Sequence, residues 1–428
     1  MREGEKVRKA RFLRLNVIPV LVVGGLALAG CSSSSSSSSS SPQSAGTSSS
    51  SGASSSSSAD ISALSNAVNQ AAAEPTFADY GPGYGDKVTN VANLAGKKIM
   101  IIPGVSALAA CTEIAQATAA LATAVGMKPT IFANQGTPAE HNTAIENAIH
   151  QHYAAIAMGC AMDPSQNAPA IGQALNAGIA ISVYGQTQEE AALDKVQYNN
   201  VDTYATDAKL AADQAVSQHD GKPFQAIAIV SKATPATATM ENALRAELTA
   251  TCPGCTVTDV NVEVPDWTNQ IASATSSALL QNPNATVIFP FYAGMLTYML
   301  AGIQSAHKTN SVKTYLAFGG GTPFVKLQTA DPGKSIIQSD IGGYPPWTGY
   351  LMFLQAARAL GKQPPIPYDK AIGPNRIVTP DNAVDVLTTG GNGTDWVNGF
   401  RALLSLPPLS GSALTAAATL NGAMVSQP

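Results

Sequence analysis

Residues 97–103 read "KKIMIIP" and residues 128–134 read "KPTIFAN", and the stretch between them, as far as Val125, has a helical pattern. Two further β-rich runs, "AAIAMG" at 154–159 and "IAISVYG" at 179–185, each follow another helical stretch. Short β-rich runs that alternate with longer helical ones indicate parallel strands joined by helical crossovers. This region therefore predicts a doubly wound α/β unit.

The same alternation starts again after a helical pattern at 204–218. The β-rich runs that follow are "QAIAIVS" at 225–231, "TVTDVNVEV" at 256–264, "ATVIFPF" at 285–291 and "KTYLAFGG" at 313–320. Two consecutive α/β units of similar size predict two lobes, and ligands of such sheets bind beyond the carboxyl ends of the strands. A late strand at 334–343 and a helix at 347–360 are easier to place if the chain crosses between the lobes more than once.

The N-terminus has the layout of a secretory signal. Basic residues are concentrated between Arg2 and Arg14, and a hydrophobic run extends from Leu15 to about Ala29. This run is short for a membrane span, which needs ~20 residues. Residues 28–31, "LAGC", resemble the bacterial lipobox, and the resemblance implies cleavage before Cys31 and lipidation of that residue. The alternative is an uncleaved anchor helix with an incidental cysteine.

A Ser-rich segment follows the predicted signal peptide at 1–30. As far as about Ala59 it contains little besides Ser, Gly, Ala and Thr, so it has no apolar surface to offset the entropy of ordering. We expect residues 31–75 to form a flexible tether.

The formal net charge of the chain is −4, and loss of the basic signal would make the mature chain more acidic. An acidic chain is a poor candidate for binding nucleic acid.

The order and spacing of the predicted segments resemble the periplasmic substrate-binding proteins of ABC importers, the sugar-binding class that includes ribose-binding protein. The resemblance covers residues 96–378 and rests on "GKKIMIIP" (96–103), "NTAIENAIHQHYAAIAMG" (142–159), "ALNAGIAISVYG" (174–185), "NPNATVIFPF" (282–291) and "AFGGGTP" (317–323). It implies a type I clamshell in which a multi-crossover hinge joins lobe 1 (96–187 and 344–362) to lobe 2 (188–343 and 363–378). It also implies a monomer that needs no cofactor or metal and presents a small solute to a permease in the membrane.

The resemblance also locates the ligand positions of the family on this chain. Carried over by local register, they fall on Leu108, Ala110, Cys111, Gly159, Gly185, Gln186, Met240, Trp267, Tyr292 and Gly319. In the sugar binders an aspartate and arginines hold hydroxyl groups through charge-assisted hydrogen bonds. None of the residues at these positions carries a charge, so we expect the cleft to be largely uncharged.

Aromatic residues gather at or just past the predicted strand ends, although aromatic residues make up only 6% of the chain. They are Tyr184, Trp267, Phe291, Tyr292, Tyr344 and Trp347. A weakly polar cleft lined by rings suits a flat or apolar-faced small molecule. The alternative is that several of these rings fill the core or the hinge.

The cysteines after Cys31 favour disulfides, because an exported protein matures in an oxidising environment. Cys252 and Cys255 lie in a turn before a strand, and we predict a local structural disulfide between them. Cys111 and Cys160 follow neighbouring strands and could bridge near the floor of the cleft, although the sequence does not give their Cα separation.

Other motifs do not indicate a catalytic or metal centre. His150 and His152 are two residues apart, so on a helix they point in different directions and are not expected to share a metal. The sequence contains no G-x-S-x-G elbow, P-loop or H-E-x-x-H motif.

These observations predict a lipid-anchored, extracytoplasmic receptor of an ABC importer, not an enzyme, that captures a small, largely uncharged, aromatic or ring-faced molecule. A sugar receptor of the same family, a ligand sensor for a membrane signalling partner and an exported enzyme stay open as alternatives. Related transcription repressors are excluded by the lipobox and by the lack of a helix-turn-helix before the first lobe. The C-terminal extension at 379–428 exceeds what the family needs, and the sequence assigns it no function.

Overall fold

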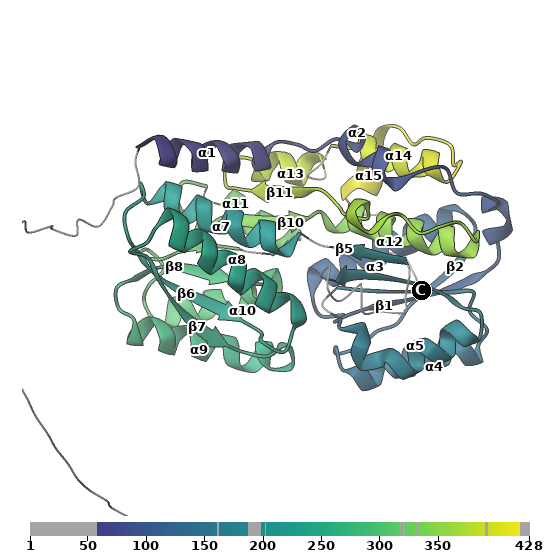
Figure 1. Cartoon of the computed structure of the whole chain (residues 1–428), viewed down its shortest axis with the longest axis horizontal. Coiled ribbons are helices and arrows are strands. Elements are labelled where there is room, and N and C mark those ends of the chain that lie inside the picture. The colour runs from purple at the N-terminus through teal and green to yellow at the C-terminus, as the bar shows by residue number, and fades with distance from the viewer. Residues whose placement is uncertain are drawn as a thin grey trace, which may run out of the picture. The chain divides into compact units, whose positions relative to one another are not determined.

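The computed structural model describes residues 58–160, 162–186, 198–201, 203–316, 318–319, 322–330, 332–389 and 393–419. All of them belong to one compact unit, which contains two lobes, each built on its own sheet (Figure 1). The predicted signal peptide at 1–30, the lipidation site Cys31 and the tether as far as residue 57 lie outside the described residues.

Lobe 1 is built on a parallel sheet with the strand order β2-β1-β3-β4-β5. Its strands are β1 (Lys98–Pro103), β2 (Lys128–Ile131), β3 (Ala155–Gly159), β4 (Ala180–Gln186) and β5 (Tyr198–Val201). Its main helices are α3 (Ala109–Ala124), α4 (Pro138–His150), α5 (Ala168–Asn176) and α12 (Pro345–Leu360).

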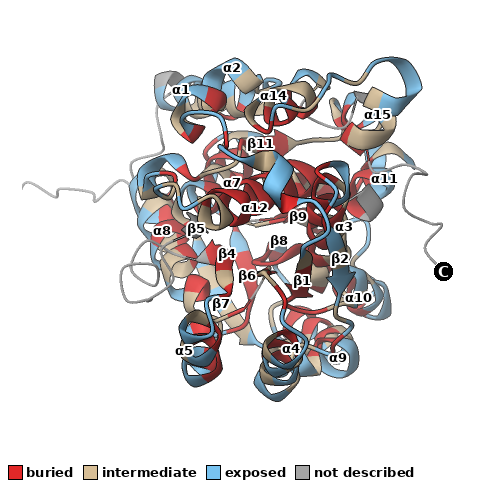
Figure 2. Cartoon of the chain, turned by 90° about the vertical axis from the view of Figure 1, so that its right-hand side faces the viewer, coloured by how far each residue is buried: buried red, intermediate tan, exposed pale blue. Residues whose placement is uncertain are grey.

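Helices cover both faces of this sheet, which explains the sequence of its inner strand β1. Successive residues of a strand point to opposite faces. Ile99 and Ile101 of β1 belong to the same cluster as α3 and α12, whereas Met100 and Ile102 pack with α4 and α5. Because both faces are buried, every position of the run is apolar instead of every second one. Figure 2 shows these buried strands between more exposed helices.

Lobe 2 is built on a sheet with the strand order β11-β10-β9-β8-β6-β7. Its strands are β6 (Gln225–Val230), β7 (Thr256–Asn261), β8 (Ala285–Pro290), β9 (Lys313–Tyr315), β10 (Ile337–Gly343) and β11 (Asn375–Val378). β11 pairs antiparallel with β10, and the other pairs are parallel. Its main helices are α7 (Tyr204–Gln218), α8 (Pro235–Thr251), α9 (Trp267–Gln281), α10 (Ala293–Ser305) and α11 (Thr322–Ala330). The predicted fold of two doubly wound lobes is confirmed.

Short 3-10 helices lie in the connections of both lobes. They are η1 (Gly81–Tyr84), η2 (Val91–Leu94), η3 (Pro164–Asn167), η4 (Val264–Asp266), η5 (Pro332–Lys334) and η6 (Tyr368–Lys370).

Two predicted lobe boundaries are wrong. Lobe 1 does not end at residue 187, because β5 pairs in parallel with β4 and extends this lobe to Val201. Residues 363–371 were expected in lobe 2, but Ile366 and Ala371 are buried in the core of lobe 1. The chain returns to lobe 2 only at β11. Both errors concern connections whose own sequences carry little apolar pattern.

The expected tether is also too long. Its last part, Ser58–Ala72, is helix α1, which lies against α7 of lobe 2. Ile61, Leu64 and Val68 recur at helical spacing and pack on the core of lobe 2. The small polar residues around these three positions hide the apolar stripe from an argument based on composition.

The C-terminal extension is folded as far as it is described. Helix α13 (Ala383–Thr389) packs against α11 of lobe 2, whereas α14 (Asp395–Leu403) and α15 (Gly411–Thr419) pack against α12 of lobe 1. With α1 and the short helix α2 (Phe77–Tyr80), these helices lie along one side of both lobes (Figure 1). Trp396 and Phe400 of α14 are fully buried, and the Trp396 ring stacks on Trp347 with centroids 5.4 Å apart.

Candidate functional site: the cleft between the lobes

A pocket lies at the carboxyl ends of strands from both sheets. Lobe 1 contributes Leu108, Ala109, Ala110, Cys111, Cys160, Met162 and Gly185, and lobe 2 contributes Tyr204, Thr234, Pro235, Ala236, Trp267, Tyr292, Ala293, Gly294, Phe318, Gly319 and Phe324. The cavity leaves about 50 Å³ open to the centres of water molecules. Because one water needs ~10–15 Å³ by this measure, the pocket has room for a few waters.

An aromatic wall forms the lobe 2 side of the pocket. Ring centroids are 4.7 Å apart for Tyr204 and Phe318, 6.3 Å for Phe318 and Tyr292, and 5.9 Å for Tyr292 and Trp267. Trp267 is the first residue of α9 and Tyr292 is the N-cap of α10, so both rings are positioned where a helix begins after a strand. Continuous ring surface of this kind offers contact area to a flat or apolar solute.

The polar atoms of these rings are engaged within the protein. Trp267 Nε1 donates to Ser231 Oγ at 2.9 Å and to Val262 O at 3.0 Å. The hydroxyl of Thr237 donates to Ser231 O at 2.6 Å, so in its 2.8 Å contact with Tyr292 the tyrosine hydroxyl is the donor. The ring faces remain for contact with a solute.

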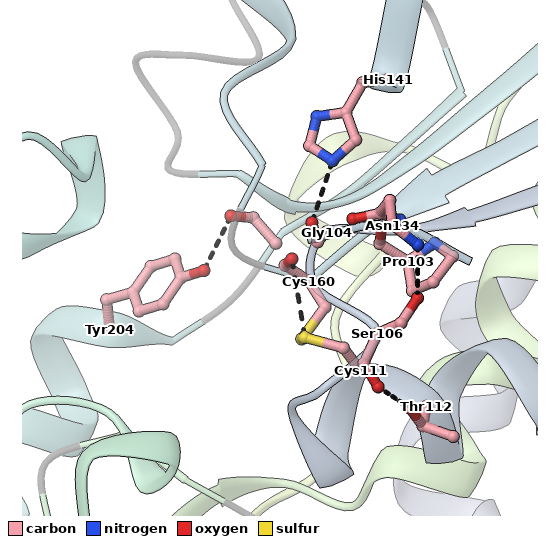
Figure 3. Close-up of a disulfide and its surroundings, with 10 residues drawn as sticks. Pro103, Gly104, Ser106, Cys111, Thr112, Asn134, His141, Cys160 and Tyr204 are labelled. Atoms are coloured by element: carbon pink, nitrogen blue, oxygen red, sulfur yellow. Dashed lines mark hydrogen bonds between the residues drawn. A yellow bond between two sulfur atoms is a disulfide. The ribbon is translucent and has the colours of Figure 1, made fainter. Parts of the chain in front are cut away.

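A disulfide forms the floor of the pocket on the lobe 1 side (Figure 3). Cys111 lies in the first turn of α3 and Cys160 directly follows β3, with Cα atoms 5.2 Å apart. The second predicted disulfide, between Cys252 and Cys255, is also present, with a Cα separation of 5.4 Å. The predicted Cys252–Cys255 pairing is confirmed. The Cys111–Cys160 pairing, which the sequence left open, is present, and only this disulfide lines the pocket.

One hydrogen bond joins the lobes at the edge of the pocket. The hydroxyl of Tyr204, at the start of α7 in lobe 2, donates to the carbonyl of Gly185 in lobe 1 at 2.7 Å (Figure 3). Gly185 has φ = 91°, a left-handed conformation that favours glycine. The bond places the Tyr204 ring at the junction of the lobes.

No charged side chain is among the described residues that line the pocket. At Gly319, an added Cβ would collide with the carboxyl group of Asp340 from strand β10. Asp340 is only 1% exposed and does not line the pocket. The buried carboxylate behind Gly319 therefore leaves no room for a side chain at this position.

The predicted ligand residues divide into two groups. Leu108, Cys111, Trp267, Tyr292 and Gly319 line the pocket, as do Ala110 and Gly185. The side chain of Gln186 lies outside the described part of the chain. The pocket does not include Gly159, Tyr184, Met240, Phe291, Tyr344 or Trp347.

The residues of the second group pack elsewhere in the lobes. Met240 and Phe291 are fully buried in the core of lobe 2, and Tyr184 is buried in lobe 1. A Cβ on Gly159 would meet Tyr184 and Met352, so this glycine serves packing inside lobe 1.

Tyr344 and Trp347 face the C-terminal helices. The Tyr344 hydroxyl donates to Ala418 O at 3.0 Å, and burial, with the nearby charge of Glu113, raises the pKa of this phenol. Trp347 Nε1 donates to the Tyr84 hydroxyl at 2.8 Å. Both rings belong to a core that the C-terminal extension completes.

The sequence argument missed several residues of the pocket, including Cys160 as a lining residue, Tyr204, Gly294 and Phe318. One signal could have located Thr234, Pro235 and Ala236. They begin the first helix after the first strand of lobe 2, the position that Leu108, Ala110 and Cys111 occupy in lobe 1. Tyr204 carries no comparable local signal.

Other chemistry is not assembled around the cleft. In the described ranges, no cluster of His, Cys, Asp and Glu side chains could hold a metal ion. His141 is buried, its Nε2 lies 2.9 Å from Gly104 O, and burial lowers the pKa of its imidazole.

None of the helices that the structure describes has the length and apolar character needed to cross a membrane.

The sequence pattern of the periplasmic binding protein domain matches residues 99–364. This match covers more than half of the chain, and the chain therefore belongs to the periplasmic binding protein family, whose members are transport receptors and not enzymes. A search of curated protein sequences found no match.

Solved structures with the same fold are similar at low sequence identity. A 5-methylthioribose transporter solute-binding protein from Thermotoga lettingae, in complex with 5-methylthioribose, is 17% identical with a TM-score of 0.58, over 76% of this chain and 97% of that one. A sugar ABC transporter protein from Yersinia enterocolitica is 17% identical with a TM-score of 0.61, over 73% and 95%. A carbohydrate transporter protein from Acidothermus cellulolyticus, in complex with myo-inositol, is 16% identical with a TM-score of 0.56, over 68% and 96%.

Proposed function

We propose that this protein is the solute receptor of an ABC importer and that its cleft captures a small, largely uncharged molecule with an apolar face. The observation that carries the proposal is the chemistry of the pocket. Rings of lobe 2 face aliphatic side chains and a disulfide of lobe 1, with no charged group among the described lining residues. Ligand sites of this kind gain affinity from apolar burial and orientation from a few polar atoms.

The ligands of the structural neighbours indicate which molecules to consider. Their structures contain 5-methylthioribose in one case and myo-inositol in another. The first of these combines a sugar ring with an apolar methylthio group, a mixed character that also suits the pocket described here. A fully hydroxylated sugar suits it less, because each hydroxyl that is desolvated without a good partner costs ~1–3 kcal/mol.

Native mass spectrometry of the protein purified from its host tests this function. We expect an additional mass from a small neutral molecule, which is released on denaturation and is strongly reduced by Trp267→Ala. Tyr298→Ala is the matched control, because Tyr298 packs on the core of the same lobe but does not line the pocket. A co-purified charged molecule that survives Trp267→Ala would contradict the proposed ligand class.

We further propose that the receptor is attached to the outer face of the cytoplasmic membrane through a lipid on Cys31. The support is the lipobox-like "LAGC" and the Ser-rich segment behind it, which would keep the lobes within reach of a permease. Cys31→Ala is expected to leave a folded protein that no longer sediments with membranes. Retention of this variant in the membrane fraction would show that another element anchors the chain.

A further inference from the structure

One side chain of lobe 1 reaches across the cleft. Leu108 is the N-cap residue of α3 in lobe 1, but it packs against the apolar core of lobe 2. Its contact point is Gly294 at the start of α10, where an added Cβ would lie 2.6 Å from Leu108 Cδ2 and 2.8 Å from Trp267 Cζ3. Only a residue without a Cβ leaves room for both side chains. The two lobes therefore meet at an apolar contact inside the pocket.

The loop that carries Leu108 is fixed on one side by hydrogen bonds. Ser106 N donates to Asn134 O at 3.2 Å, and Asn134 N donates to Ser106 Oγ at 3.0 Å. The hydroxyl of Thr112 in the first turn of α3 donates to Ser106 O at 2.9 Å (Figure 3). These bonds attach the loop to the segment after β2, on the side of the outermost strand of the sheet.

The disulfide fixes the other side. It joins the first turn of α3, at Cys111, to Cys160 at the end of the neighbouring strand β3. Cys160 has φ = 70°, in the left-handed region where glycine is favoured and other residues are strained. A cysteine at a position suited to glycine indicates that the cross-link, and not the backbone, determines this residue.

We propose that the Cys111–Cys160 disulfide is a positioning element of the binding site, which holds Leu108 against Gly294 and Trp267 as an apolar latch between the lobes. The inference rests on the proposed function in one respect, namely that the latch closes over a captured solute. Because the latch consists of protein atoms alone, it favours the closed form even before a solute binds. The apparent affinity for a solute then depends on an intact disulfide through the fraction of closed receptor.

Hydrogen exchange of the solute-free, full-length protein tests the latch without knowledge of the ligand. The readout is the peptide that contains residues 292–296 in lobe 2, because Leu108 covers it from lobe 1. We expect Leu108→Ala and the double variant Cys111→Ser/Cys160→Ser each to increase its exchange ~10-fold, since both favour the open form. Cys252→Ser/Cys255→Ser removes the disulfide outside the pocket and should leave this peptide unchanged.

Matched controls separate a latch from a structural effect. Leu175→Ala removes a partly buried leucine from the core of lobe 1 that does not line the cleft, so it should affect lobe 1 peptides only. Unchanged exchange at 292–296 in the folded double cysteine variant would overturn the positioning role of the disulfide. If that variant does not fold, the parent protein with its disulfides reduced under native conditions takes its place. Unchanged exchange at 292–296 in Leu108→Ala would overturn the latch. Failure to find any neutral solute would instead contradict the proposed function, because exchange of the solute-free protein does not depend on it.

Discussion

Gly319 shows how a single residue sets the chemistry of the cleft. From the sequence we expect an uncharged residue at this ligand position, but the sequence does not show what lies behind it. In the structure the carboxylate of Asp340, from a strand that follows later in the chain, occupies the space that a side chain at 319 would need. The acidic group thus lies behind the wall of the pocket, and a residue without a side chain lines the pocket itself.

Local sequence predicts some pocket residues and fails for others with the same signal. The sequence predicts Trp267 and Tyr292 because they lie at or just past strand ends and at ligand positions implied by the family resemblance. In the structure Trp267 begins α9 and Tyr292 is the N-cap of α10, and both line the pocket. Tyr344 and Trp347 have the same kind of placement, but their partners are Ala418 and Trp396. These partners lie far along the chain in a region beyond the family resemblance, so no local register could separate the two cases.

At the residue scale, Asp213 on α7 gives a pH-dependent prediction. Burial raises the pKa of its carboxyl from the ordinary value of 3.8 to about 7, and repulsion from Glu247 adds to the effect. The folded state therefore holds this proton more tightly than the unfolded chain, and the free energy of unfolding falls as the pH rises between these two values. We expect Asp213→Asn to be more stable than the parent at pH 8 and equal to it below pH 4.

Thermal and urea unfolding of both proteins across this pH range measure the effect. Asp220→Asn is the control, because the side chain of Asp220 is 79% exposed. Parallel pH profiles for Asp213→Asn and the parent would show that folding does not raise the pKa of this carboxyl.

At the scale of elements, the strands were predictable and the added helices were not. Each central strand is buried on both faces, so its own sequence records its position as a continuous apolar run. Strand β5, at Tyr198–Val201, has the sequence "YNNV" at the edge of the sheet and lacks such a run. Helices α1 and α14 are encoded by a few apolar residues each, and only the lobes that they cover show why these residues are needed.

The aromatic face of α14 carries the prediction at this scale. Trp396 is fully buried against Trp347, Tyr350 and Phe400. Trp396→Ala should therefore lower the free energy of unfolding by ~3–5 kcal/mol, the usual cost of removing a large ring from a packed core. Urea unfolding measures it, with the exposed Val384→Ala of α13 as a control that should change little. A loss below ~1 kcal/mol would mean that α14 does not contribute to the core.

For the whole molecule, the two ends of the chain join the lobes at more places than the predicted hinge. The chain passes from α1 on lobe 2 to α2 on lobe 1, and from α13 on lobe 2 to α14 on lobe 1. Arg376 Nε donates to Ala72 O at 3.0 Å, and Phe77 N donates to Asp395 Oδ2 at 3.1 Å, so the N-terminal and C-terminal segments hold each other. Opening and closing of the two lobes must therefore take place while these N-terminal and C-terminal segments still connect them.

The central claim is that this receptor selects neutral molecules by an apolar face, and calorimetric titration with matched pairs tests it most directly. The pairs are 5-methylthioribose with ribose, and cyclohexanol with myo-inositol, each measured on the parent protein and on Trp267→Ala. We predict that the more apolar member of at least one pair binds on the order of 10-fold more tightly, and that Trp267→Ala removes the difference. Tighter binding of ribose or myo-inositol, unchanged in Trp267→Ala, would contradict the account.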